Sequence, residues 1–241
     1  MPVVLENLGK RFGDGAPVLD DVNANIKQGE FVALLGASGC GKSTLLNIIA
    51  GLEAPTSGAL EVPSDGAAFM FQDAALFPWL TARENIELAL KLRGVGKAER
   101  RTKAQELLEL VHLGSAGDKR PHELSGGMRQ RVSLARSLAQ DRQLLLMDEP
   151  FAALDAITRD LLHDELERIW KETGRTIVFV THNVREAVRL GQRVLLLSSR
   201  PGRVVQEWSV TEEHRTDAGL AGQLTGVITA RLREEIRRHA K

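Results

Sequence analysis

One segment constrains the fold of this chain more than any other feature, namely Gly36–Ser43, which reads GASGCGKS. It matches the pattern G-x-x-x-x-G-K-[ST], which binds phosphate groups when it joins a β-strand to an α-helix. The apolar run 31–35 precedes the segment, and a helical pattern from Lys42 to a stop at Gly51 follows it. Because this context is met, we favour a phosphate-binding loop over a glycine-rich turn without function.

Each residue type in this loop suits a phosphate ligand. The glycines let the backbone turn tightly so that its N–H groups point inward, and the dipole of the following helix adds positive charge. Lys42 is expected to reach the β- and γ-phosphates, and the Ser43 hydroxyl is expected to bind Mg²⁺. The further residues expected to contact the nucleotide here are Gly36, Ser38, Gly39, Cys40, Gly41 and Thr44. The Cys40 side chain is expected to be a small filler and not a reactive thiol.

Strand and helix patterns alternate along most of the chain. Short apolar runs with the length of buried strands lie at 67–71, 144–147, 176–180 and 194–197. Alternation of strands with helices predicts a largely parallel sheet flanked by helices. We therefore predict an α/β fold, in which a P-loop NTPase core with a mixed, largely parallel sheet carries an inserted α-helical subdomain.

The middle of the chain differs from this alternation, because helical patterns at 81–93, 97–111 and 125–139 follow one another with few strand formers between them. We expect one domain over residues 1–241, divided into a core (1–80 and 141–208), a helical subdomain (81–140) and a C-terminal tail (209–241). The end of the tail is predicted to be helical, with Val227, Leu232 and Ile236 on one side.

Composition limits the partners that the chain can have. The 32 Lys and Arg residues balance 32 Asp and Glu residues, so bulk charge predicts neither nucleic acid nor an anionic membrane as the main partner. No apolar run approaches the roughly 18 residues that cross a bilayer, and residues 1–12 lack the pattern of a signal peptide. Cys40 is the only cysteine, which favours a reducing compartment. We therefore expect any membrane role to depend on a partner protein.

Two further segments carry chemistry. Ser125, Gly126 and Gly127 follow Leu124 at the start of a predicted helix, and such a helix start can bind a second anion. On its own, Ser125 would be better explained as a helix N-cap. The buried run 144–147 ends in Asp148 and Glu149, which suit Mg²⁺ binding and the positioning of a water molecule, respectively. The alternative is an acidic turn at a strand end.

These motifs, in their order along the chain, resemble those of ATP-binding cassette (ABC) proteins. The resemblance covers about residues 3–208, and it rests on Gly36–Ser43, Gln72, Leu124–Gly127, Asp148–Glu149, Leu154–Asp155 and His182. It implies that Gln72 contacts Mg²⁺ and senses a membrane partner, that Asp155 crosses to a second subunit, and that His182 contacts the γ-phosphate. It further implies that Phe12 stacks on adenine, where the family usually has tyrosine. Without the family, Gln72 would be explained as a polar residue at a strand end, His182 as a capped turn histidine and Phe12 as a core aromatic.

The resemblance also implies an assembly and an activity. Two copies would bind two ATP molecules head to tail, each between the phosphate loop of one copy and Ser125–Gly127 of the other, and hydrolyse them with Lys42, Gln72, Glu149 and His182. The closer similarity is to importers of nitrate, sulfonate and taurine, through segments 71–79, 148–155 and 195–203. This similarity implies that the chain works with transmembrane permease subunits and a substrate-binding protein. It also implies a peripheral location on the cytoplasmic face of the inner membrane. We expect part of the run Phe77–Leu80 to line the groove in which the permease docks. The alternative is that all four residues are buried within the subunit.

Three other functions are possible for these motifs. A non-transport cassette ATPase of repair or translation usually has a long coiled coil or two cassettes in one chain. A P-loop small-molecule kinase has no use for Leu124–Gly127, and a regulatory module without catalysis would not need Lys42 or Glu149. The chain departs from the family at Met128, at Asn183 and in a short stretch between Gly58 and Phe71.

Overall fold

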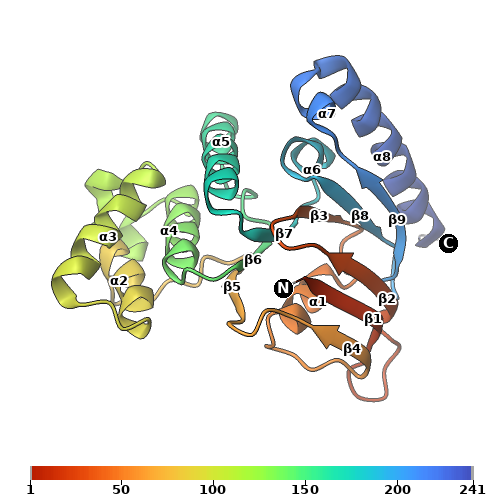
Figure 1. Cartoon of the computed structure of the whole chain (residues 1–241), viewed down its shortest axis with the longest axis horizontal. Coiled ribbons are helices and arrows are strands. Elements are labelled where there is room, and N and C mark those ends of the chain that lie inside the picture. Colours follow the sequence, from red (N-terminus) through yellow and green to blue (C-terminus); the bar gives the residue numbers. More distant parts are fainter. Residues whose placement is uncertain (1, 240–241) are drawn as a thin grey trace.

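A computed structural model describes residues 2–239, and the strands of these residues form two sheets (Figure 1). The larger, six-stranded sheet has the order β5-β6-β7-β3-β8-β9. Its strands are β3 (Phe31–Leu35), β5 (Ala67–Met70), β6 (Leu144–Asp148), β7 (Thr176–Val180), β8 (Arg193–Leu197) and β9 (Val204–Ser209). All neighbours pair in parallel except β8 and β9, which are antiparallel. The prediction of a mixed, largely parallel sheet is confirmed.

The smaller sheet is antiparallel and has the order β2-β1-β4. It consists of β1 (Val3–Lys10), β2 (Leu19–Ile26) and β4 (Ser57–Glu61). Gly58 allows β4 to approach β1 closely, because a Cβ atom there would lie 2.4 Å from the carbonyl oxygen of Asn7. The short stretch 58–71 thus supplies strands to two different sheets, β4 to the smaller one and β5 to the larger one.

The hydrophobic core lies on both faces of the larger sheet, because successive residues of a strand point to opposite faces. On one face, α1 (Lys42–Ile49) and the smaller sheet cover side chains such as Val32 and Leu34. On the other face, Phe31 contacts Trp170 and Phe179 edge-on, at ring-centroid distances of 5.7 and 5.4 Å. Helices α5 (Ala156–Thr173) and α6 (Val184–Leu190) cover this second face. The sheet is therefore buried on both sides, as expected for parallel strands.

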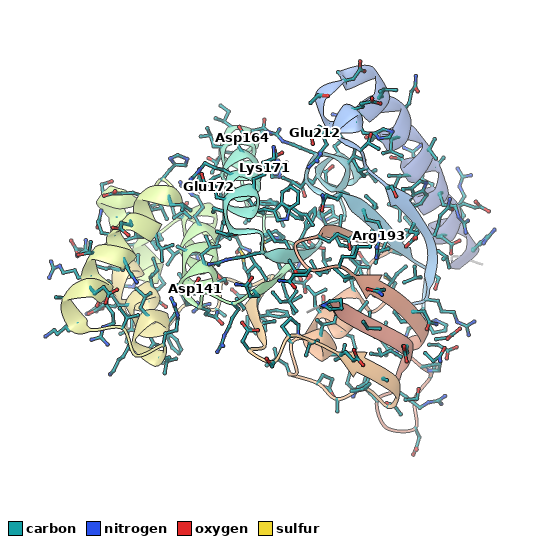
Figure 2. The ribbon with its side chains drawn as sticks, viewed as in Figure 1. Asp141, Asp164, Lys171, Glu172, Arg193 and Glu212 are labelled. Atoms are coloured by element: carbon teal, nitrogen blue, oxygen red, sulfur yellow. The ribbon has the colours of Figure 1, made fainter. Side chains whose placement is uncertain are left out.

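The helical region lies beyond the β5 edge of the larger sheet (Figure 1). Its helices are α2 (Ala82–Leu92), α3 (Lys97–Leu110), two 3₁₀ turns (Gly114–Ala116 and Pro121–Glu123) and α4 (Gly126–Ala139), which match the predicted positions. Thr81 and Glu84 cap α2 reciprocally. Asp141, labelled in Figure 2, pairs with Arg93 of α2 and with Arg175 before β7, both at 2.5 Å. These ion pairs join the helical region to the core; its behaviour as a subdomain stays a prediction.

The C-terminal residues form α7 (Glu212–Thr216) and α8 (Ala218–His239), and α8 lies along the β8–β9 side of the molecule (Figure 1). The predicted apolar side of this tail is wrong. Val227 and Ile236 are exposed, whereas Ile228 is buried and Leu232 packs against the core. The reason is helical geometry. Val227 and Leu232 are five positions apart, which corresponds to a rotation of about 140° around a helix with 3.6 residues per turn, so they do not lie on one side. Among the described residues, no helix has the length and apolar character needed to span a membrane.

Candidate functional site

The phosphate loop lies between β3 and α1, as the motif requires. Gly41 directly precedes α1 with φ of 104°, a left-handed conformation that glycine adopts without strain. A Cβ atom at Gly41 would also approach Leu19 Cδ2 to 2.7 Å. Helix α1 begins at Lys42, so its first N–H groups face the loop. The local sequence therefore forms the tight loop before a helix N-terminus that a phosphate site requires, and its binding of phosphate stays a prediction.

The buried Lys42 side chain folds back onto its own loop. Its Nζ donates hydrogen bonds to the carbonyl oxygens of Gly36 at 3.0 Å and Ala37 at 2.8 Å. The Cys40 thiol lies 3.8 Å from Nζ in the core, and burial raises the pKa of this thiol although Lys42 opposes the shift. The Cys40 side chain is therefore a filler, and only its backbone can face a phosphate group.

A pocket of about 480 Å³ opens beside this loop. It is lined by Phe12, Val18, Ser38, Gly39, Gly41, Lys42, Ser43, Thr44, Gln72, Glu149 and Arg200. Most of the residues that the sequence assigned to the nucleotide are thus together, whereas Gly36 and Cys40 lie behind the lining. Sequence reasoning missed Val18 and Arg200. Arg200 belongs to the segment 195–203, whose only sequence signal is its similarity to the importers.

Phe12 is 50% exposed, so its interpretation as a core aromatic is wrong. The ammonium group of Lys10 lies 4.8 Å from the centre of its ring. Lys10 is held there by an ion pair with Glu53 at 2.5 Å. A cation on one face of the ring leaves the other face for a flat ligand in the pocket, and an adenine base has the right shape.

Two carboxylates lie at the end of β6. Glu149 lines the pocket, whereas Asp148 is outside its lining and contacts Ser43, which lines it. Asp148 is buried, and burial raises the pKa of its carboxyl group, while a hydrogen bond with the Ser43 hydroxyl opposes this shift. The contact between Ser43 and Asp148 joins two oxygen ligands of the type that Mg²⁺ prefers. The residues present therefore fit the predicted metal site, with the Gln72 amide on the same pocket wall.

Glu149, Gln72 and His182 meet at the edge of the pocket. Glu149 Oε2 lies 3.2 Å from His182 Nδ1 and 3.5 Å from Gln72 Nε2. These residues follow β6, β5 and β7, whose carboxyl ends lie side by side in the sheet. Glu149 adopts φ of 48°, and its backbone N–H donates to Val180 at 3.0 Å. A carboxylate held between an amide and an imidazole can orient a water molecule towards a phosphate group.

Other predicted residues are not in this pocket. Ser125 caps α4 by accepting a hydrogen bond from Met128 N at 3.2 Å, and Gly126 is exposed beside it. Asp155 caps α5 in the same way, and the hydrogen bond from Thr158 N lowers the pKa of its carboxyl group. Within one copy, both residues are helix caps on the surface, away from the phosphate loop.

The Gln72 segment is attached to α4. Gln130 Nε2 donates to the Gln72 carbonyl oxygen at 3.3 Å. Arg136 donates to the carbonyl oxygens of Ala74 and Ala75 at 2.9 and 2.8 Å. A movement of α4 would therefore displace a residue that lines the pocket.

Comparison with known proteins gives a consistent result. The ABC transporter family model matches residues 19–152. A taurine import ATP-binding protein of Mesorhizobium japonicum is 47% identical over 90% of this chain and 88% of its own length. A bicarbonate transport ATP-binding protein of Synechococcus elongatus is 50% identical over 83% of this chain, which covers 32% of that protein.

Solved structures are similar as well. A dimeric bacterial ABC transporter cassette superposes with a TM-score of 0.80 and 37% identity, over 87% of this chain and 99% of that one. A dimeric cassette in a post-hydrolysis state, bound to ADP and Pi, gives a TM-score of 0.79 with the same identity and coverage.

Proposed function

The chain belongs to the ABC transporter family and is an ATPase of that family, and on this basis we propose that it powers the import of a small anion through a separate membrane permease. The predicted fold class and family are confirmed. One observation carries the proposed chemistry: a phosphate loop and the Glu149 carboxylate line the same pocket.

Nucleotide binding would use the loop and Phe12. Lys42 Nζ would exchange its bonds to the Gly36 and Ala37 carbonyl oxygens for bonds to phosphate oxygens, because bonds between ionised partners are stronger than those to neutral carbonyls. Mg²⁺, when held by Ser43, Asp148 and Gln72, would neutralise charge on the β- and γ-phosphates. The open face of Phe12 would stack on adenine. The loop glycines and Thr44 would complete the phosphate contacts.

Hydrolysis would depend on Glu149. Its carboxylate would orient the attacking water, while Gln72 and His182 hold the carboxylate at the pocket edge. Glu149→Gln keeps the size of the side chain and removes its charge. ATP turnover should fall about 10²-fold or more with ATP affinity retained, since general-base groups contribute about 10²–10⁴-fold. Glu6→Gln, on an exposed strand position, is the matched control. Equal turnover in both variants would exclude the proposed role.

The assembly would be a head-to-tail dimer. Ser125–Gly127 and Asp155 lie at exposed helix starts outside the pocket of their own copy, and the similar solved cassettes are dimeric. The free N–H groups of α4 would bind the nucleotide held by the second copy, because helix N-termini attract anions. We expect residues 81–140 to move as a subdomain when the dimer closes.

The permease would dock in an apolar groove of about 450 Å³ beside the Gln72 segment. The groove is lined by Phe69, Phe71, Ala75, Phe77, Asn85, Leu88, Ala89, Leu92, Arg93, Arg136, Gln140 and Arg142. Phe77 lines it, and Trp79, 66% exposed, lies next to Phe77 at a ring distance of 5.5 Å. The alternative that Phe77–Leu80 is wholly buried is wrong. The groove suits an amphipathic helix with an acidic end facing Arg136 and Arg142.

Docking can be tested by co-purification. Phe77→Ala and Trp79→Ala should each reduce association with the permease while the isolated chain still binds ATP. Val227→Ala, which removes an exposed apolar side chain on α8, is the control and should leave association unchanged. Unchanged association in both groove variants, with normal folding, would show that the permease binds elsewhere.

The cargo is proposed from the relatives, whose names refer to taurine import and bicarbonate transport. A sulfonate such as taurine, or nitrate, is the proposed substrate, delivered by a substrate-binding protein. The chain would be peripheral on the cytoplasmic face of the inner membrane. Vesicles that contain the permease and this chain should accumulate labelled taurine or nitrate only with internal ATP and the binding protein. Uptake without ATP hydrolysis would contradict the proposal.

A further inference from the structure

Arg200 forms part of the pocket wall that faces the carboxylates from the other side. It lines the pocket with Lys42 and Glu149 and is exposed there. Strand β3, which leads into the phosphate loop, has β7 and then β6 on one side and β8 on the other. His182 follows β7, and Glu149 follows β6. Arg200 follows β8, so it approaches the nucleotide site from the side opposite the hydrolytic residues.

The guanidinium of Arg200 is unpaired in the part of the chain that the structure describes. Within residues 2–239 it makes no hydrogen bond or ion pair. Arg203 in the same loop, by contrast, pairs with Asp20. A cation without a partner, in a pocket built for polyphosphate, is a candidate ligand for phosphate oxygens because its planar donors match them.

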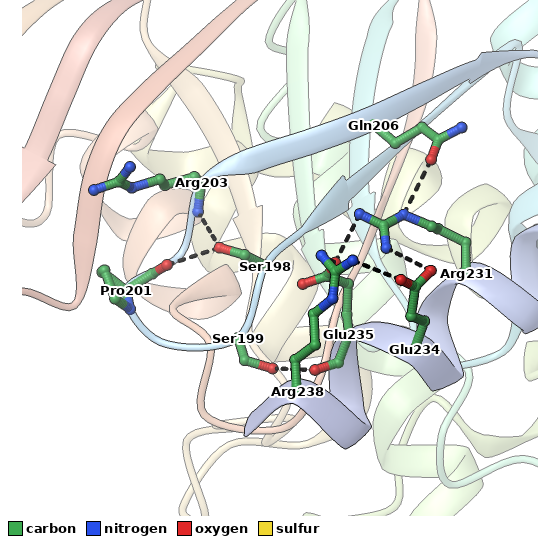
Figure 3. A network of polar contacts seen from close by, with 9 residues as sticks. All are labelled: Ser198, Ser199, Pro201, Arg203, Gln206, Arg231, Glu234, Glu235 and Arg238. Atoms are coloured by element: carbon green, nitrogen blue, oxygen red, sulfur yellow. Dashed lines mark hydrogen bonds and ion pairs between the residues drawn. The ribbon is translucent and has the colours of Figure 1, made fainter. Parts of the chain in front are cut away.

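The loop that carries Arg200 is fixed in shape (Figure 3). Ser198 Oγ donates to the Pro201 carbonyl oxygen at 2.7 Å and accepts from Arg203 N at 2.9 Å. Ser198 N also donates to the Arg203 carbonyl oxygen at 2.8 Å. These bonds close residues 198–203 into a compact turn, so Arg200 projects from a rigid base.

The same loop is locked against the phosphate loop. A Cβ atom on Gly36 would lie 3.3 Å from Leu197 Cβ, and one on Gly202 would lie 2.3 Å from the Cys40 carbonyl oxygen. Gly202 N further donates to the Val18 carbonyl oxygen at 2.8 Å. Leu197 and Gly202 thus lie against Gly36 and Cys40 of the phosphate loop. Arg200 lies between them in sequence and lines the same pocket as Ser38 and Gly39 of the phosphate loop.

The C-terminal helix supports the loop from behind (Figure 3). Ser199 Oγ donates to the Glu235 carbonyl oxygen of α8 at 3.1 Å. The Glu235 carboxylate is buried and pairs with Arg231 at 2.7 Å and with Arg238 at 3.1 Å. Glu234 pairs with the same two arginines. This network fixes the turn of α8 that receives Ser199, and so connects the tail to the nucleotide pocket.

We propose that Arg200 binds the phosphate chain of the nucleotide at the part common to ATP and ADP, and that α8 positions it through the Ser199–Glu235 contact. The inference rests on the proposed nucleotide site. Arg200 lies away from Glu149 and His182, so it acts in binding and not in hydrolysis. Its loss should raise KM and leave kcat nearly unchanged, as expected for a contact that is equal in the ground and transition states. The tail 209–241 thereby gains a role in nucleotide affinity.

The test is calorimetric titration of the full chain with ADP and with ATP, in low and high salt. Arg200→Ala should weaken both nucleotides about tenfold and reduce the salt dependence of binding, because a charged contact is lost. Arg200→Lys should restore part of the affinity. Arg203→Ala is the matched control, since it removes a cation from the same loop that pairs with Asp20 and does not line the pocket.

The role of α8 is tested by a double-mutant cycle. Ser199→Ala should weaken ADP binding several-fold in the wild-type chain and have no further effect in Arg200→Ala, because Ser199 acts only through Arg200. Equal effects in both backgrounds would overturn the positioning role. Unchanged affinity of Arg200→Ala for ADP and ATP would overturn the main proposal. Lys42→Ala distinguishes failure of the Arg200 proposal from failure of the proposed nucleotide site. If Lys42→Ala also binds ATP normally, the nucleotide site itself is wrong.

Discussion

His163 offers a quantitative test of how α5 packs behind the site. Its ring is only 3% exposed and lies edge-on to Phe151 at 4.5 Å, and neither ring nitrogen has a hydrogen-bond partner within residues 2–239. Burial lowers the pKa of this histidine to about 4; Arg189 and Arg159 lower it further in the same sense, whereas Asp160 and Asp164 oppose the shift. The folded state therefore holds His163 neutral at pH values where the unfolded chain is already protonated.

The sign of the effect follows from proton binding. Between pH 6.5 and 4 the unfolded state binds more protons than the folded state, so the free energy of unfolding must fall as the pH falls. With a pKa of about 4 in the folded state and about 6.5 in the unfolded state, the loss is about 2 kcal/mol from pH 7.5 to pH 5. It would approach about 3 kcal/mol below pH 4.

The perturbation is His163→Leu, which has a similar volume, cannot titrate and breaks no hydrogen bond. Urea unfolding of both chains at pH 7.5, 6 and 5 isolates the effect of His163, because other titrating groups are shared. The wild type should lose about 2 kcal/mol more than the variant over this range. His122→Leu, at an exposed histidine, should behave as the wild type does. Parallel stability losses in wild type and His163→Leu would refute the reasoning.

Three further predictions concern the nucleotide site and the core. Lys42→Ala should lose most ATP affinity and turnover, measured by titration and phosphate release, because the charge beside the β- and γ-phosphates is removed; wild-type activity would refute the assignment. Phe31→Ala should lower the free energy of unfolding in urea by about 3–5 kcal/mol, because the buried ring contacts two aromatic neighbours; a loss below about 1 kcal/mol would contradict this packing. Gly202→Ala should weaken ADP binding, because its Cβ would clash with Cys40; Gly222→Ala, with open space around it, should not.

Local features were predictable from the sequence. The phosphate loop, the positions of α2–α4 and the acidic end of β6 follow from glycine spacing, helical periodicity and a short apolar run. The departures from the family pattern also have local explanations. Asn183 caps α6 by accepting from Arg185 N at 3.0 Å, as an acidic residue could, and Met128 packs against the hydrophobic core.

Features that depend on contacts distant in sequence were not predictable. Arg200 reaches the pocket because β8 lies beside β3, a pairing that joins residues far apart along the chain. The predicted side of α8 did not follow the helical period, and the face that is buried depends on the elements against which the helix packs. Ser125 could not be placed by the sequence or by a single copy, since its proposed partner is another molecule.

The head-to-tail sandwich is the central claim, and Glu149→Gln tests it most directly. With hydrolysis blocked, bound ATP should hold two copies together, because a ligand that binds the closed dimer more tightly than the single copy shifts the equilibrium towards the dimer.

The measurement is light scattering of Glu149→Gln with ATP and Mg²⁺, at protein concentrations of roughly tens of micromolar, where weak dimers are populated. We predict twice the mass of the 26.4 kDa chain with ATP, one chain mass with ADP, and a return to one chain mass when Ser125→Arg is added. A Glu149→Gln chain that binds ATP yet keeps the mass of one copy, or a dimer that Ser125→Arg leaves intact, would contradict it.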